Sequence, residues 1–341
     1  MKTNKFWYKI ALPRFNQEAK NFMTYFLRLT LLLIGLFFMT NTHALEIYAH
    51  RGASSLLAEG TIPAYIAAIR MRADVIDMDI ALTKDNIVVV NHDQRLSDEL
   101  TRDKEGHWLK KPGPYIRELT FAELQAYDVG AINPKSALAK KFPNVYALNH
   151  VATPSLQEVI RAANRESNNT IRFQIEIKTS PKDEKLEATP ETIVPPLLKV
   201  LQEEGVLDRT EIHSFDWRNL MLIKKLEPHA TISFISEQSI AFNTISPFTG
   251  PSWTAGYNVK DYDNSVPKII AALGGKIWCP AFTDLTKERV SEAHRYNIKV
   301  VPWTVDSTAD MNKIIDMGVD GIITNYPHVL FGIRTAREIE K

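Results

Sequence analysis

Histidine side chains that could carry out acid–base chemistry stand at the ends of short apolar runs in the sequence. His50 directly follows the run 47–49, and His92 lies just beyond the run 87–90. Two histidines at the ends of separate strands can act on one bond as general base and general acid. The spacing therefore predicts that His50 and His92 form an acid–base pair.

Acidic residues occupy matching positions in two further apolar runs. Asp77 and Asp79 lie within the run 75–82, and Glu176 lies near the end of the run 171–177. Alternate residues of a strand share one face, so the two aspartates point the same way. Three carboxylates without a thiolate suit one hard divalent cation, Ca²⁺ or Mg²⁺. On their own, the two aspartates could instead be a buried polar pair satisfied by the backbone.

Two basic residues accompany these groups, and the charge of the remaining chain narrows the choice of ligand. Arg51 follows His50, and Lys178 follows Glu176 by two positions, which favours an anionic ligand such as a phosphate. The chain has a formal net charge of +1, but residues 1–44 carry six basic side chains and one acidic, so the remainder is mildly acidic. This acidic remainder of the chain lacks the basic face that binding to nucleic acids requires. We therefore expect a small-molecule partner and no nucleic acid.

Strand-like and helix-like segments alternate through most of the chain, which predicts an α/β sheet or barrel. The strand-like runs are 47–49, 75–82, 87–90, 171–177, 210–214, 231–235, 276–279, 299–305 and 321–324. The clearest helical patterns are 63–71, 155–165, 217–226, 287–296 and 309–317, with candidate N-caps at Ser155, Asp216 and Ser307.

The strand count exceeds an eight-stranded barrel by one. Only residues 83–86 separate the second run from the third, and a parallel crossover needs a longer connection. Either these two runs form a hairpin-like distortion or one run lies outside the barrel. The polar segment 93–153, rich in Pro and Gly, is predicted to be an insertion at the top of the barrel.

The basic N-terminal end has the features of a signal peptide. Arg28 precedes the apolar run 29–39, which is shorter than the roughly 20 residues that a membrane-spanning helix needs. Thr42 and Ala44 place small residues where a signal peptidase reads them. We therefore expect residues 1–44 to be removed, the single mature domain to begin at Leu45, and the protein to be periplasmic or secreted.

Two observations bear on how this end is processed. Met23 would begin a signal of more conventional length, and no cysteine near residue 44 offers a lipid anchor. The alternative is an uncleaved membrane anchor. The single cysteine, Cys279, excludes an intramolecular disulfide and a zinc site with two or more thiolates.

Taken together, the motifs make the sequence resemble the glycerophosphodiester phosphodiesterase family. The resemblance rests on His50-Arg51-Gly52-Ala53, Glu59, Thr61, Asp77-Met78-Asp79, Thr83-Lys84-Asp85, His92-Asp93, Glu176-Ile177-Lys178, Ser214-Phe215, Trp303-Thr304 and Gly321-Ile322-Ile323-Thr324. It implies a TIM-type (β/α)₈ barrel with an inserted segment and one divalent cation. It also implies hydrolysis of glycerophosphodiesters, the deacylated phospholipids, to sn-glycerol 3-phosphate and an alcohol.

The same resemblance implies a role for each candidate residue. His50 and His92 correspond to the acid–base pair, Arg51 to the phosphate contact, Asp77, Asp79 and Glu176 to the metal ligands, Glu59 and Lys178 to the rest of the polar pocket, and Trp303 to its wall.

Three positions depart from the family pattern. Asp77 stands where Glu is usual, and its side chain is one methylene shorter. Glu59 lies in Ala58-Glu59-Gly60 in place of Pro-Glu-Asn, which keeps the carboxylate and loses an amide. Asn325 stands where an aspartate is common.

Two other functions remain open at this point. A phospholipase-type relative that acts on intact lipid would need an apolar rim, for which the segment 240–253 is the candidate. A catalytically silent periplasmic protein that binds glycerol phosphates is the other, and the departure at Asp77 is its only support. His213, beside the Ser214-Phe215 motif, is a further histidine that could approach the site.

Overall fold

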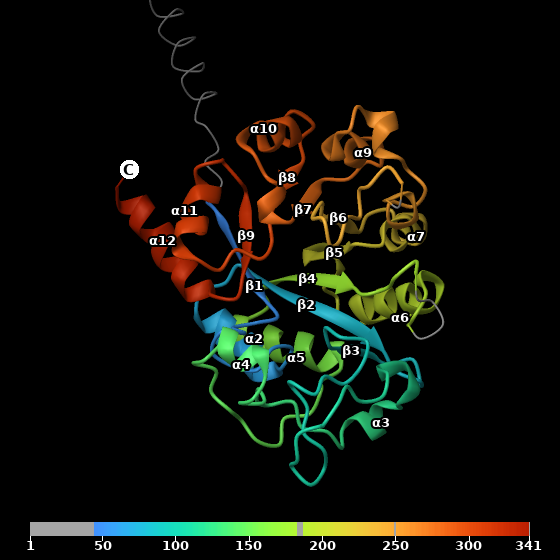
Figure 1. Ribbon diagram of the computed structural model, residues 1–341, viewed down its shortest axis with the longest axis vertical. Coiled ribbons are helices and arrows are strands. Elements are labelled where there is room, and N and C mark those ends of the chain that lie inside the picture. The colour runs from blue at the N-terminus through green and yellow to red at the C-terminus, as the bar shows by residue number, and fades with distance from the viewer. Residues whose placement is uncertain (1–43, 183–186, 249, 341) are drawn as a thin grey trace, which may run out of the picture. The chain divides into compact units, whose positions relative to one another are not determined.

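The computed structural model describes residues 44–182, 187–248 and 250–340, and its folded unit spans Leu45–Lys341. Parallel strands form the centre of this unit in the order β8-β7-β6-β5-β4-β2-β1-β9, with helices around them (Figure 1). The parallel strands are β1 Glu46–His50, β2 Val75–Leu82, β4 Arg172–Ile177, β5 Thr210–Ser214, β6 Thr231–Ser236, β7 Ile277–Pro280, β8 Lys299–Val300 and β9 Gly321–Thr324.

Backbone hydrogen bonds join the two ends of this strand order. Beyond β8, the chain continues extended, so that Pro302 O accepts from Ile323 N at 3.0 Å and Val305 N donates to Ile323 O at 3.0 Å. Asp320 N also donates to Val300 O. The sheet is therefore a nearly closed barrel of eight parallel strands, which confirms the TIM-type fold expected from the resemblance.

The extra strand among the nine predicted is the run 87–90, which forms β3, Val88–Val90. It pairs antiparallel with the carboxyl half of β2 and lies outside the barrel order. The connecting turn is held by Thr83, whose Oγ1 contacts Asp85 Oδ1 at 2.6 Å and accepts from Ile87 N at 2.9 Å. Asn86 takes a φ of 61°, which asparagine tolerates in tight turns. Both explanations offered for the extra strand are thus correct: it is a hairpin arm, and it is outside the barrel.

Helices lie between successive strands and cover the barrel (Figure 1). They are α2 Ile62–Arg70, α5 Leu156–Ser167, α6 Pro190–Glu203, α7 Trp217–Leu226, α9 Val266–Ala272, α10 Lys287–Arg295, α11 Thr308–Ile315 and α12 Pro327–Ile339. The short helices are η1 Ile116–Glu118, α3 Phe121–Leu124, α4 Ala137–Lys141, η2 Leu207–Arg209, α8 Gly250–Trp253, η3 Val259–Tyr262 and η4 Phe282–Asp284. Ser155, Asp216 and Ser307 cap α5, α7 and α11 through side-chain acceptors, as predicted.

Between β3 and α5 the chain forms an excursion that carries η1, α3 and α4. This excursion has a small core of its own, in which Leu96, Ile116 and Leu124 pack against Ala81 and Val89 of the β2–β3 hairpin. The hairpin therefore holds the excursion against the carboxyl end of β2, beside the candidate site residues.

The predicted signal peptide falls on residues 1–43, which are outside the described residues. Within the described ranges, no helix combines the length and the apolar character needed to cross a membrane.

Candidate active site

Strand register brings the predicted site residues together inside the barrel. His50 pairs with Asp77, Asp79 pairs with Glu176, and Glu176 pairs with His213 on the next strand. These residues alternate along their strands with residues that pack against the surrounding helices, so their side chains point into the barrel. They lie at the carboxyl ends of the strands, where TIM barrels carry their active sites. They line a cavity of about 110 Å³ that contains His50, Arg51, Asp77, His92, Glu176, Lys178, His213, Phe215, Ile235, Trp303, Thr304 and Ile323. Asp79 and Glu59 line an adjoining recess that shares Arg51 and His92.

His50 is held in one tautomer by a relay of polar groups. Asn325 donates its Nδ2 to Asp306 Oδ2 at 2.7 Å, and its backbone N–H donates to Oδ1 of the same carboxylate. Since a carboxylate only accepts, the amide oxygen of Asn325 faces His50 Nδ1, 2.8 Å away. Nδ1 therefore carries the proton and Nε2 keeps its lone pair.

The surroundings of His50 favour its neutral form. Burial, together with the positive charge of Arg51, holds the pKa of His50 well below its usual value. An aspartate at position 325 would oppose this by stabilising the imidazolium, whereas the amide of Asn325 supplies an acceptor without a charge. His50 is therefore suited to be the general base.

Exchanging the relay's two side chains is expected to change the pH profile. In the double variant Asp306→Asn/Asn325→Asp the hydrogen bond between the two positions is kept, and a carboxylate faces His50. Because that carboxylate raises the pKa of His50, the acidic limb of the kcat/KM profile should move to higher pH. Asp306→Asn alone is the control. An unmoved acidic limb in the double variant would contradict the assignment of His50 as the base.

His92 lies at the opening of the cavity and is partly exposed. Its Nδ1 is 2.7 Å from Asp93 Oδ1. The hydrogen bond from His92 lowers the pKa of Asp93, so the carboxylate stays ionised and accepts from Nδ1. In the imidazolium form both ring nitrogens of His92 carry a proton, and the Asp93 carboxylate balances that charge, so Nε2 can deliver a proton in the cavity.

Arg51 is fixed by two carboxylates and by a strained backbone. Its Nη1 contacts Glu59 Oε1 at 2.8 Å, and its Nε lies 3.1 Å from Asp79 Oδ2. The residue takes a φ of 55°, in the left-handed region that few non-glycine residues adopt. At Gly52 a Cβ would lie 2.7 Å from the carbonyl carbon of Ala64, so the turn after β1 can pack only with glycine there. The loop thus holds a guanidinium rigidly at the cavity wall.

The three carboxylates differ in their partners. Lys178 Nζ lies 2.6 Å from Glu176 Oε1 and 3.1 Å from Asp79 Oδ1, whereas Asp77 Oδ1 contacts His213 Nε2 at 3.1 Å. Burial raises the pKa of Glu176 and of Asp77 despite these contacts. Burial acts on Asp79 too, but Lys178 and Arg51 hold its pKa well below the usual range.

This geometry can be compared with that of known proteins. Residues 50–329 match the model of the glycerophosphoryl diester phosphodiesterase family, from the first site histidine to α12. The chain belongs to this family.

Individual relatives agree with this membership. The chain is 28% identical to a glycerophosphodiester phosphodiesterase of Caldanaerobacter subterraneus subsp. tengcongensis, over 84% of this chain and 96% of the relative. It is 26% identical to a Bacillus subtilis enzyme of the same name, over 84% and 85%. A Silicibacter pomeroyi structure to which this activity is also attributed superposes with a TM-score of 0.77 at 28% identity, covering 87% of this chain and 95% of that one.

A further structure shares the fold at lower identity. An Oleispira antarctica phosphodiesterase in complex with the product sn-glycerol-3-phosphate gives a TM-score of 0.61 at 19% identity, over 87% of this chain and 97% of that one.

Members of this family generally use a divalent metal ion, and the donor set of this chain fits a hard one by its chemistry. Asp77, Asp79 and Glu176 offer only oxygen ligands from adjoining strands. Burial makes the ionised forms of Asp77 and Glu176 unfavourable, and a cation would relieve that cost. Their oxygens are not gathered into a preformed site: the part of the chain that the structure describes contains no group of three or more His, Cys, Asp or Glu side chains placed to hold a metal. Lys178 lies between two of the three carboxylates instead.

His213 lines this cavity, although the sequence analysis assigned it no role there. Its side chain is almost fully buried, and its hydrogen bond to Asp77 raises the pKa of His213 to about 10 against the opposing effect of burial. The available signal was its position, one residue before Ser214-Phe215 and on the inward-facing alternation of β5. It holds the carboxylate that is shorter than the family's usual one.

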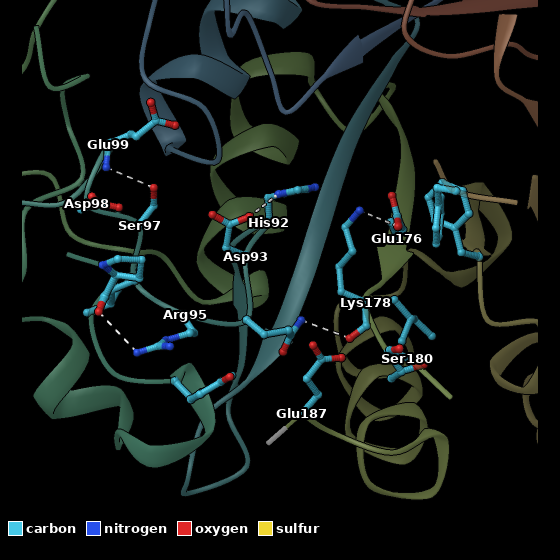
Figure 2. Close-up of a pocket in the computed structure, with 18 of the residues that line it drawn as sticks. His92, Asp93, Arg95, Ser97, Asp98, Glu99, Glu176, Lys178, Ser180 and Glu187 are labelled. Atoms are coloured by element: carbon cyan, nitrogen blue, oxygen red, sulfur yellow. Dashed lines mark hydrogen bonds and ion pairs between the residues drawn. The ribbon is translucent and has the colours of Figure 1, made fainter. Parts of the chain in front are cut away.

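An aromatic wall runs outward from the cavity of about 110 Å³ around His50 and Arg51, the reaction cavity. The rings of Trp303, Phe215, Phe242 and Trp253 form successive edge-to-face pairs with centroid separations of 5.3, 5.5 and 5.3 Å. Trp303 is thus placed in the wall of the cavity, as the resemblance implied. Phe242 and Trp253 come from the 240–253 segment, and they line a larger pocket that shares His92, Glu176, Lys178 and Phe215 with the first. Figure 2 shows His92, Glu176 and Lys178 at this larger pocket.

Proposed function

We propose that this protein is an exported, metal-dependent hydrolase that cleaves glycerophosphodiesters to sn-glycerol 3-phosphate and an alcohol. His50 and His92 act as the acid–base pair, and Asp77, Asp79 and Glu176 hold one Ca²⁺ or Mg²⁺. The observation that carries the proposal is the placement around one small cavity of a fixed arginine and two histidines, each held at Nδ1 by a partner. Family membership supports the reaction class.

Each group has a task in the displacement at phosphorus. His50 Nε2 takes the proton of the attacking hydroxyl, either water or the glycerol hydroxyl beside the phosphate, as the new P–O bond forms. His92 gives its proton to the leaving alcohol oxygen as the old P–O bond breaks. Arg51 neutralises charge on the phosphate oxygens, and a bound cation would add electrostatic stabilisation of the same charge. Glu59 and Asp79 keep the guanidinium in place.

The test is release of sn-glycerol 3-phosphate from glycerophosphocholine and related diesters, measured with Ca²⁺, with Mg²⁺ and with a chelator. Turnover distinguishes an enzyme from a silent binding protein. Binding of glycerol 3-phosphate without any turnover of a diester would overturn the proposal.

A second candidate, action on intact lipid, has one structural feature in its favour. Ile240 and Phe248 are large apolar side chains exposed on the 240–253 segment, next to the residues that line the larger pocket. A human lysophospholipase D is 22% identical over 87% of this chain. Including lysophosphatidylcholine in the substrate panel separates the two activities.

Export is expected to remove residues 1–44, because Thr42 and Ala44 follow an apolar run too short to span a bilayer. Mass spectrometry of the exported protein should find Leu45 at the N-terminus. Ala44→Trp should block the cleavage, since the peptidase reads a small residue there. A mature chain that retains Phe37 and Phe38 would contradict the prediction.

A further inference from the structure

The inner face of the barrel is polar next to Asp77, where TIM barrels usually carry bulky branched side chains. His213, Ser233 and Cys279 come from the adjoining strands β5, β6 and β7, and each of these side chains is at most 2% exposed. Gln174 of β4 is fully buried beside them. Of this group, only His213 touches one of the proposed metal ligands, and the reaction steps assigned above use none of it.

The ring of His213 has two nitrogens to satisfy, and Asp77 meets only one of them. Nε2 lies 3.1 Å from Asp77 Oδ1, and a carboxylate oxygen accepts, so Nε2 carries a proton. Nδ1 is fully buried, and the polar group beside it is the thiol of Cys279. The contact falls outside ideal hydrogen-bond geometry, in keeping with sulfur as a weak partner.

A thiol suits this place because it can both donate and accept. When the ring of His213 is neutral, Nδ1 can accept from the S–H of Cys279, and when the ring is charged, its Nδ1–H can donate to the sulfur. In both forms the proton on Nε2 stays directed at Asp77. The contact between Cys279 and His213 therefore does not depend on the charge of the ring.

The side chain of Cys279 is itself held in one direction. Its Sγ lies 3.1 Å from Ser233 Oγ, and Gln174 Nε2 lies 3.7 Å from the same sulfur. Trp303 Nε1 donates to the backbone oxygen of Cys279 at 3.0 Å, which ties this residue to the wall of the reaction cavity. Contacts on several sides thus keep the thiol against His213.

We propose that Cys279 is a positioning residue: it fixes the ring of His213, so that Nε2 keeps Asp77 in place and the site holds its affinity for a divalent cation. The contacts run from Ser233 through Cys279 and His213 to Asp77. This inference rests on the proposed function and adds to it a residue that acts on the metal ligand without touching the cation.

The test is calorimetric titration of Ca²⁺ and of Mg²⁺ into the wild type, Cys279→Val and Cys279→Ser. Changing a residue that supports a metal ligand costs about 10–100-fold in metal affinity, and for this weak sulfur contact we expect about tenfold from Cys279→Val. Cys279→Ser keeps a group that donates and accepts, so it should recover most of the lost affinity.

The matched control is Ile277→Val. Ile277 lies on the same face of β7 as Cys279 and is buried in the same apolar cluster, but its side chain has no polar atom. This variant changes the packing inside the barrel without touching the contacts of His213, and it should keep the wild-type affinity. Circular dichroism of each variant establishes that it is folded.

A His213→Ala background separates positioning from a general loss of packing. If Cys279 acts through the ring of His213, Cys279→Val should cost no further metal affinity in that background. An equal loss in both backgrounds would overturn the inference, because packing inside the barrel would then carry the effect. Wild-type affinity in a folded Cys279→Val variant would overturn it as well.

Cleavage of glycerophosphocholine by the wild type is measured alongside, which separates this inference from the function on which it rests. Cleavage and cation binding by the wild type, combined with either of the two contrary results for Cys279→Val, would overturn the inference and leave the proposed function standing. A wild type that binds neither Ca²⁺ nor Mg²⁺ would overturn the metal-dependent function and this inference together.

Discussion

Replacing either His50 or His92 by alanine is expected to lower turnover by roughly 10²–10⁴-fold, the usual contribution of a positioned general acid or base. We assign His50 as the base because Asn325 fixes its protonated Nδ1 and burial keeps the ring neutral. We assign His92 as the acid because the Asp93 carboxylate that holds its Nδ1 can balance an imidazolium, whose Nε2 carries the proton to be delivered. The loss should appear mainly in kcat, since we assign binding of the phosphate to Arg51 and not to either ring.

The control is His294→Ala. His294 also forms a histidine–aspartate contact, with its Nε2 2.9 Å from Asp320 Oδ2, but it lines neither cavity. This variant should keep wild-type turnover. Near-normal turnover in a folded His50→Ala or His92→Ala variant would refute the corresponding assignment, and circular dichroism of each variant establishes that it is folded.

The barrel could be predicted because its signals are local. Segments in which β-branched or aliphatic residues occupy alternate positions, such as 75–82 and 210–214, coincide with β2 and β5 to the residue. The caps at Ser155, Asp216 and Ser307 were readable for the same reason, since a capping side chain bonds to a backbone amide two or three residues away.

Other elements were missed because tertiary packing overrides the local signal. The helix α6 contains Pro195 and Pro196, and proline in a helix interior is unfavourable. The helix forms nevertheless because Ile193, Val194 and Leu197 are fully buried against the core. The predicted strand 299–305 is shortened to β8 because Pro302 has no amide to donate to the ladder. Its carbonyl nevertheless accepts from Ile323 and helps close the barrel.

The candidate site also contains residues that the sequence predicts and contacts that it does not. Motif residues such as His50, Arg51 and Asp79 could be named from the sequence because each lies next to a strand end. The contacts that tune them come from distant parts of the chain: Asp306 acts on His50 through Asn325, and His213 reaches Asp77 across 136 positions. Only the folded barrel brings these partners together.

Chelation of divalent cations is expected to abolish activity reversibly. The four carboxylates around the cavity, Asp77, Asp79, Glu176 and Glu59, are offset only in part by Lys178, Arg51 and His213. Burial also raises the pKa of both Asp77 and Glu176. A divalent cation removes that conflict. Activity should return when Ca²⁺ or Mg²⁺ is added back, and titration of each ion identifies the better one.

Asp79→Asn should weaken metal affinity by more than about tenfold without unfolding the chain, since even outer-shell changes cost that much. The fold survives because each basic partner of Asp79 keeps another carboxylate: Lys178 keeps Glu176, and Arg51 keeps Glu59. Glu166→Gln, which breaks an exposed pair with Arg70, is the control. Calorimetric titration of the metal into each variant measures affinity independently of turnover.

Asp77→Glu restores the usual ligand of the family, and its effect depends on His213. In the wild type, His213 holds Asp77 Oδ1 at 3.1 Å, which draws the shorter side chain toward β5. The added methylene lets a carboxylate keep that contact and still extend into the cavity. We therefore expect Asp77→Glu to keep or tighten metal binding, and His213→Ala to remove the difference between Asp and Glu at this position. Full activity after exhaustive chelation would overturn the metal-dependent mechanism, and weaker metal binding by Asp77→Glu would show that the shorter ligand is the one this barrel is built around.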